Sequence, residues 1–120
     1  MRQGIRLFLF FEGAAFIVAS LTHFGVLMHG YEHRPAGTAE SVIGVVLLIG
    51  FALSWMLPKS TRGIGIATQA FALLGTLVGI YTIAIGIGPR TAPDITYHII
   101  IVIVLVCGLI VAIRGRAGTS

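Results

Sequence analysis

HFGVLMHGYEHRPAGTAE, residues 23–40, is the stretch that decides the fold, because it interrupts an otherwise apolar sequence. It contains three of the four histidines and two of the four acidic residues of the chain. Gly30, Pro35 and Gly37 favour a turn-rich connection within it. The stretch therefore separates two long apolar runs, and each run is expected to form a helix of its own.

The composition around this stretch is that of a membrane protein. The chain has 120 residues, of which 57% are hydrophobic and 10% charged, and its mean hydropathy is +1.02. Soluble domains carry about 25% charged residues, so too few polar side chains are present to cover a soluble core. The formal net charge of +4 does not indicate nucleic-acid binding, because the basic residues flank the apolar runs and serve as membrane anchors. The expected partner is the lipid bilayer.

Four apolar runs predict four membrane helices, at about residues 5–28, 39–57, 64–87 and 94–113. The first run continues past Glu12, so it is expected to be an uncleaved helix and not a signal peptide. Thr38 is the predicted N-cap of the second helix, with Glu40 in its first turn. Thr91 is the predicted N-cap of the fourth, with Asp94 completing a capping box. The predicted fold is an all-α, single-domain, integral membrane four-helix bundle.

The positive charges predict how this bundle is oriented. Six of the eight Lys and Arg residues lie at the two termini and in the second loop, whereas the first and third loops carry only Arg34 and Arg90. By the positive-inside rule, both termini are expected in the cytoplasm and the first and third loops outside. The single cysteine, Cys107, excludes an intrachain disulfide and a multi-cysteine metal site.

Polar side chains inside apolar helices are costly and therefore informative. Glu12 and His23 are eleven residues apart, close to three helical turns, so they share one face of the first helix. At about 1.5 Å per residue, Gln69 lies at the depth of Glu12, and His98 at the depth of His23. A Glu12–Gln69 hydrogen bond between neighbouring helices is therefore expected.

The third helix carries small residues along one side, including a Gly75-x-x-x-Gly79 pair. Such stripes let helix backbones approach closely in membranes. The partner of this face is either another helix of the same chain or a second copy, as in a homo-oligomer. The members of the stripe are Thr68, Ala72, Gly75, Gly79, Thr82 and Gly86.

The main candidate site lies at the outer mouth of the bundle, where the sequence places all four histidines. Imidazole is the commonest metal ligand, so His23, His29, His33 and His98 are candidate ligands of a metal ion. His23 and His98 could alternatively ligate a haem axially. The competing interpretations are hydrogen bonding within the bundle, solvation of the loop histidines, and pH sensing. The predicted mouth is lined by His23, Glu32, His33, Arg90, Asp94 and His98.

Three other functions remain open from the sequence. In size, helix number and a glutamate in its first helix, the chain resembles small multidrug-resistance transporters, which implies proton coupling through Glu12. The aromatic residues of such a transporter's pocket do not align with those of this chain. A structural subunit that binds a partner helix is the second possibility. An enzyme is not expected, since the sequence contains no nucleophile elbow, phosphate loop or HExxH pattern.

Two further segments are informative together: residues 69–79, QAFALLGTLVG, and residues 88–94, GPRTAPD, with Tyr97 and His98 following. With them, most of the chain resembles a group of small four-helix bacterial inner-membrane proteins without an assigned function. The resemblance implies the same fold and a multi-pass location in the bacterial plasma membrane. It assigns no catalytic or binding residue.

Overall fold

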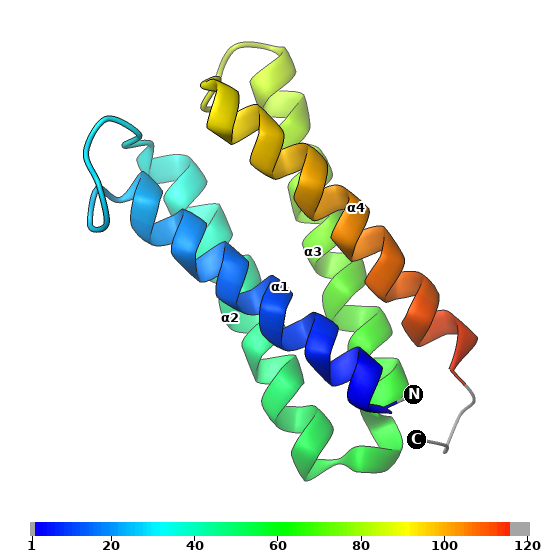
Figure 1. Ribbon diagram of the computed structural model, residues 1–120. Coiled ribbons are helices and arrows are strands. Elements are labelled where there is room, and N and C mark those ends of the chain that lie inside the picture. Colours follow the sequence, from blue (N-terminus) through cyan, green and yellow to red (C-terminus); the bar gives the residue numbers. More distant parts are fainter. Residues whose placement is uncertain (1, 116–120) are drawn as a thin grey trace.

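The computed structural model describes residues 2–115 and consists of four long helices (Figure 1). Their bounds are Arg2–His23 for α1, Arg34–Met56 for α2, Thr61–Ala84 for α3 and Ala92–Arg114 for α4. A short 3-10 helix, η1 (Pro58–Ser60), joins α2 to α3. No strand occurs in the described residues, which confirms the all-α four-helix fold.

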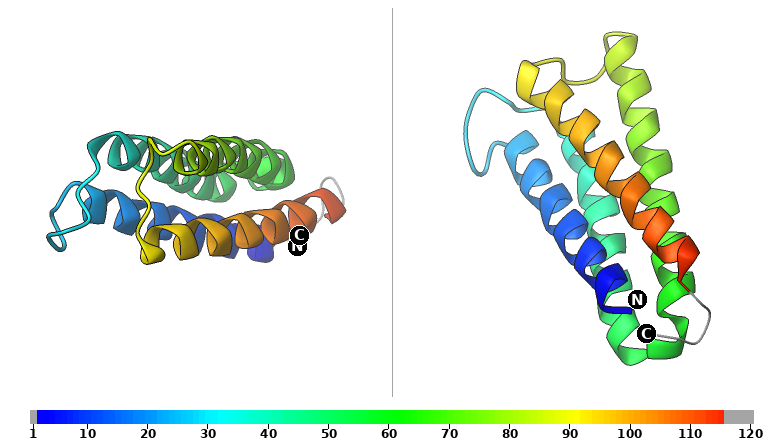
Figure 2. Two further views of the ribbon diagram at one scale, coloured as in Figure 1. Left: turned by 90° about the horizontal axis from the view of Figure 1, so that it is seen from above. Right: turned by 45° about the vertical axis from the view of Figure 1, so that its right-hand side comes forward.

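The helices are arranged in two layers, with α1 and α4 in one and α2 and α3 in the other (Figure 2). The bundle measures 45 × 25 × 16 Å, and α1 packs most extensively on α2 and much less on α4. We call the end that holds the start of α1, η1 and the end of α4 the terminal end. The opposite end, which holds the loops 24–33 and 85–91, is called the histidine end.

The outer surface of the bundle is largely apolar, unlike that of a soluble protein. Large apolar side chains face outward, with Phe11 64% and Leu74 65% exposed, while Glu12 and Gln69 are fully buried. Each of the four long helices is long and apolar enough to cross a bilayer. Extensive exposed apolar surface marks a membrane-facing or interaction surface. The arrangement is therefore that expected of a multi-pass membrane protein.

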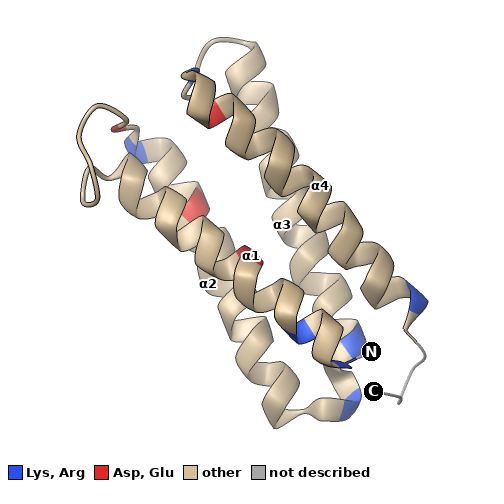
Figure 3. Cartoon of the chain, viewed as in Figure 1, with Lys and Arg blue, Asp and Glu red and all other residues tan. Residues whose placement is uncertain are grey.

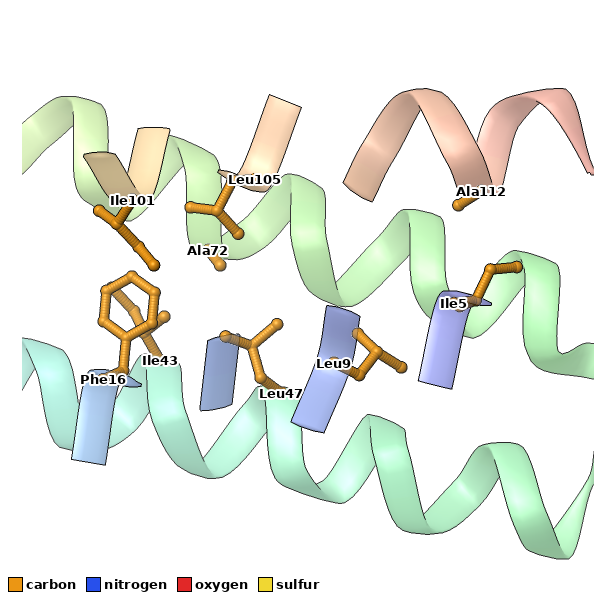
Figure 4. Packing of buried hydrophobic residues seen from close by; sticks show 9 residues of the cluster. All are labelled: Ile5, Leu9, Phe16, Ile43, Leu47, Ala72, Ile101, Leu105 and Ala112. Atoms are coloured by element: carbon orange, nitrogen blue, oxygen red, sulfur yellow. The ribbon is translucent and has the colours of Figure 1, made fainter. Parts of the chain in front are cut away.

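The apolar core runs along the bundle axis and receives side chains from all four helices (Figure 4). Leu9, Leu47, Ala72 and Leu105, one from each helix, are all fully buried. Because apolar residues of each helix also face outward, burial is decided by helical phase and not by hydrophobicity. The complete cluster is Ile5, Leu9, Phe16, Ile43, Leu47, Ala72, Ile101, Leu105 and Ala112.

The first helix ends at His23, earlier than the predicted residue 28 or so, because of Gly25. This glycine has a φ of +77°, the left-handed conformation that glycine adopts without strain. The Val26 N–H donates to the Leu21 carbonyl at 2.9 Å and the Gly25 N–H to the Thr22 carbonyl at 3.1 Å. These two bonds form a Schellman motif, which ends the helix inside the apolar run.

The second helix begins at Arg34, earlier than predicted, and its N-cap is His33 instead of Thr38. The Nδ1 atom of His33 accepts the Ala36 backbone N–H at 3.2 Å, and Pro35 lies in the first turn, where its missing N–H costs nothing. Glu40 consequently lies beyond the first turn and is only 5% exposed. This earlier start places a carboxylate inside the bundle instead of at its edge.

The third helix is shifted toward the terminal end relative to the prediction, and it too ends in a Schellman motif. Its C′ residue is Gly86, with a φ of +87°, and the Ile87 N–H donates to the Thr82 carbonyl at 2.9 Å. At the start of α4 the predicted capping box is confirmed, since Thr91 and Asp94 bond each other's backbone N–H reciprocally. Asp94 is thereby fixed at the histidine end.

Charged residues are segregated along the bundle (Figure 3). Of the seven Lys and Arg residues between positions 2 and 115, five belong to the terminal end, whereas Arg34 and Arg90 lie toward the histidine end together with Glu32, Glu40 and Asp94. At the terminal end, Arg6 donates from Nη2 to the Ser54 carbonyl at 2.7 Å and lies 3.8 Å over the Trp55 ring. Through these two interactions, Arg6 connects the beginning of α1 to the end of α2.

Candidate functional site

A buried histidine between two carboxylates joins three helices at the histidine end. His23, the last residue of α1, has its Nδ1 atom 2.5 Å from Oε1 of Glu40 on α2. Its Nε2 atom lies 2.8 Å from Oδ1 of Asp94 on α4. All three side chains are buried, so this triad is screened from solvent. The sequence predicted His23 and Asp94 as site residues, and the structure brings them into direct contact.

The two hydrogen bonds of His23 together contain two protons, which bears on the net charge of the triad. A neutral imidazole offers one donor and one acceptor, and an ionised carboxylate only accepts. Two hydrogen bonds to ionised carboxylates therefore require that His23 be an imidazolium. If instead the imidazole were neutral and one of the two carboxyl groups were protonated, the triad would contain the same total number of protons. In either distribution the triad carries a single net negative charge.

The two carboxylates of the triad differ in how completely they are bonded. In Asp94, Oδ1 faces His23, and Oδ2 accepts both the backbone N–H of Thr91, at 3.2 Å, and its hydroxyl. In Glu40, Oε1 faces His23, but the buried Oε2 has no hydrogen-bond partner among the described residues. Glu40 Oε2 is thus the unused acceptor of the triad.

A cavity of about 160 Å³ adjoins Glu40 between α2, α3, α4 and the loop 85–91. An apolar cavity of about this size, near 150 Å³, holds a benzene-sized molecule in an engineered protein. Glu40 is the only acidic residue among the described residues that line the cavity. The polar wall residues are His33, Glu40, Thr76, Thr82 and His98, and the rest, which include Phe16, Ile43, Val78 and Ile87, are mainly apolar.

The other side of the triad faces a wider apolar groove between α1 and α4, with a volume of about 600 Å³. His23, Asp94 and Tyr97 are among the polar residues of its wall. Tyr97 packs edge-on against Phe16, with ring centroids 6.0 Å apart, and its buried hydroxyl has no partner among residues 2–115. The remaining groove residues are Ala15, Val18, Ala19, Thr22, Met28, Tyr31 and Pro93.

The other predicted histidines occupy separate environments. In His33, Nδ1 accepts the cap N–H and Nε2 donates to the Ile87 carbonyl at 3.1 Å, which ties the two loops together. In His98, Nδ1 donates to the Asp94 carbonyl at 2.7 Å, and Nε2 lies beside Gly79. His29 is exposed, with Nδ1 3.6 Å from Glu32 Oε2.

These environments do not fit the expected metal or haem site. Within residues 2–115 there is no group of three or more His, Cys, Asp or Glu side chains arranged to hold a metal ion. Both ring nitrogens of His23 and of His33 are engaged in hydrogen bonds. Arg90, a predicted member of the mouth, is exposed in the loop before α4. His23 and His98 instead form hydrogen bonds within the bundle, as the competing interpretation expects.

A second buried polar group, in Glu12 and Gln69, lies deeper in the bundle. The two side chains lie near each other, since both adjoin Gly108, but the structure does not show the hydrogen bond predicted between them. The amide Nε2 of Gln69 instead donates to the Gly65 carbonyl at 3.0 Å. Both side chains adjoin Gly108 of α4, which the sequence did not indicate as part of this group.

The glycine pair on α3 is used inside the chain. A Cβ atom at Gly75 would lie 2.8 Å from Ile43 of α2, and one at Gly79 would lie 3.3 Å from His98 of α4. The stripe therefore provides close packing between α3 and its neighbours. A partner helix or second copy on the Gly75/Gly79 face stays a prediction.

Glu32 stands outside the triad, in the loop 24–33. Its carboxylate accepts the Gly30 backbone N–H at 2.6 Å. Hydrogen bonds from its own backbone N–H and from that of Gly30 lower the pKa of Glu32 below its usual value. Glu32 thus favours the folded loop above its ordinary pKa, and this contribution is lost as the pH falls toward the lowered value.

Sequence reasoning missed Glu40 as a site residue, because it placed this carboxylate in the first turn of the second helix. The available signal was Pro35, whose preference for a first turn favours a helix start near residue 34. Tyr97 was missed as well.

No protein-family model, curated protein or solved structure matches this chain.

Proposed function

We propose that this chain is a small membrane-embedded binding protein, and that its site is the triad and adjoining cavity at the histidine end. Its ligand is a small, largely apolar molecule with one positively charged, hydrogen-bond-donating group. The observation that carries the proposal is Glu40 Oε2, a buried acceptor without a partner in a residue that lines the cavity. Buried polar atoms are normally hydrogen-bonded, so an unused one beside a cavity favours a ligand that supplies the donor.

Size and charge define this ligand class. The cavity volume of about 160 Å³ suits a molecule no larger than a short branched amine or a small ring. The net negative charge of the triad favours a cation over an anion. An ammonium group donates charge-assisted hydrogen bonds, which are stronger than neutral ones. We place the protein in a bacterial plasma membrane, with the histidine end outside, because the resemblance and the positive charges favour it.

The first test is ligand binding to the protein in lipid nanodiscs, followed by NMR of methyl-labelled isoleucines. Isobutylammonium is compared with isobutanol and with the anion isovalerate. The ammonium ion is expected to shift the Ile43 methyl signal at the lowest concentration, since Ile43 lines the cavity. A failure of every probe to shift Ile43 would contradict ligand binding in this cavity.

Two variants separate the charge of Glu40 from the space in the cavity. Glu40→Gln is expected to weaken ammonium binding by about tenfold or more, because a hydrogen bond to a charged group contributes about 1.5–3 kcal/mol. Isobutanol binding is expected to change little. Ala39→Leu, which fills the cavity wall, is expected to weaken both ligands. The matched control is Glu32→Gln, an exposed acid at the same end, and it should bind like the wild type.

A further inference from the structure

Three buried oxygen atoms, on Glu12 of α1 and Gln69 of α3, receive no hydrogen bond from residues 2–115. Glu12 and Gln69 are both 0% exposed. In the described part of the chain, Oε1 and Oε2 of Glu12 and Oε1 of Gln69 have no hydrogen-bond partner. Glu12 is separated from His23 by eleven residues of α1, or about 16 Å along the helix, so this group is distinct from the triad.

Gly108 brings two of these oxygens together. A Cβ atom on Gly108 would lie 1.9 Å from Gln69 Oε1 and 2.9 Å from Glu12 Oε2. The two oxygens therefore lie on the same side of Gly108, no more than about 4.8 Å apart, the sum of those distances. Two acceptors this close need a donor between them, and the missing side chain at position 108 leaves the room for it.

Among residues 2–115, no basic side chain donates a hydrogen bond to these oxygens. On α1, Arg6 is engaged with Ser54 and Trp55. On α3, Arg62 donates to the Ile113 carbonyl at 3.0 Å. Arg114 lies at the very end of α4, and α2 has no charged residue after Glu40. No ion pair to Glu12 is found among residues 2–115.

We propose that Glu12 and Gln69 form a proton-binding site, in which the carboxyl of Glu12 holds the proton and donates it to Gln69 Oε1. An ionised carboxylate without a partner is far more costly to bury than a neutral acid. A protonated carboxyl supplies the one donor that the pair of acceptors lacks. A divalent cation is a poorer occupant, because these two side chains supply three oxygens and Ca²⁺ or Mg²⁺ takes six or more ligands.

Infrared difference spectroscopy of the protein in nanodiscs, at neutral pH, tests the site directly. Subtracting the spectrum of Glu12→Gln from that of the wild type should leave the carbonyl band of one protonated carboxylic acid, which shifts in D₂O. Glu32→Gln, which changes an exposed acid, should leave no such band. A difference spectrum with only carboxylate bands would overturn the proposal, and bands that respond to sodium would indicate a cation instead.

Gln69→Leu tests the acceptor separately. It should keep the protonated-acid band but shift its frequency, because the hydroxyl of Glu12 loses its partner. An unmoved band would show that Gln69 is not the acceptor. If Glu12→Gln fails to fold, the band is read in Glu40→Gln protein labelled with ¹³C at its glutamate carboxyl groups, in which Glu12 is the only buried glutamate. Label-sensitive absorption by a protonated acid at neutral pH is then the expected result, and its absence would contradict the proposal.

Discussion

His23 uses both ring nitrogens to connect α1 with α2 and α4, so one side chain holds three of the four helices at their histidine end. A buried polar residue such as His23 can be recognised in the sequence from its distance along the helix and from the helix face on which it lies. Glu12 and His23 were predicted on one inward face of α1, and both are buried as expected. The contact with Glu40 was missed because it depends on where α2 begins, and Pro35 is the residue in the sequence that indicates this start.

Gly108 offers a test of close packing around the Glu12–Gln69 site. Gly108→Ala is expected to lower the free energy of unfolding by about 1–3 kcal/mol, the usual cost of overpacking a filled interior. The physical reason is the 1.9 Å approach of the new Cβ atom to Gln69 Oε1. Denaturant titration in detergent micelles measures the effect. Gly63→Ala, where nothing lies within 4 Å of the added carbon, is the control. Equal stability of the two variants would contradict the packing described for Gly108.

Some residues that begin or end the helices are easy to recognise in the sequence, and others are not. The capping box of Thr91 and Asp94 was predicted correctly, because both residues belong to a short recognisable pattern. The ends of α1 and α3 were predicted too late, since Gly25 and Gly86 lie inside apolar runs that look continuous. Hydrophobicity thus locates a membrane helix, while a single glycine sets its end.

The capping box of α4 should have a measurable effect on stability. Thr91→Ala removes the side chain that accepts the Asp94 backbone N–H, so a loss of about 1 kcal/mol in the free energy of unfolding is expected. Thr91→Ser retains the hydroxyl and should remain close to the wild type. The same denaturant titration distinguishes the two. Identical destabilisation of both variants would mean that the methyl group of Thr91, and not its hydroxyl, is responsible.

At the scale of the whole molecule, the segregation of charge is the dominant feature. Most basic residues of the described chain belong to the terminal end, whereas three of the four acids, Glu32, Glu40 and Asp94, lie toward the histidine end (Figure 3). The fold class was predictable because it depends on composition and on four long apolar runs. The cavity was not, since its walls come from residues distant in the sequence, such as Ala36, Val78 and His98.

Orientation in the membrane is testable with cysteine labelling on a Cys107→Ala background. His29→Cys lies in the loop 24–33 at the histidine end, and Lys59→Cys lies in η1 at the terminal end. In intact bacterial cells, a membrane-impermeant maleimide is expected to label the first variant at once. The second should react only after the membrane is permeabilised, because positively charged loops stay in the cytoplasm. The reverse pattern would contradict the proposed orientation.

The start of α1 and the end of α4 lie at the same end of the bundle (Figure 1). A tandem gene duplication with a short linker would therefore give two halves that face the same way in a bilayer. Their pseudo-twofold axis would run along the membrane normal, as in transporters built from parallel repeats. An inverted-topology repeat would require one additional crossing helix between the copies. The even number of helices in this fold thus favours the evolution of parallel duplicates over antiparallel ones.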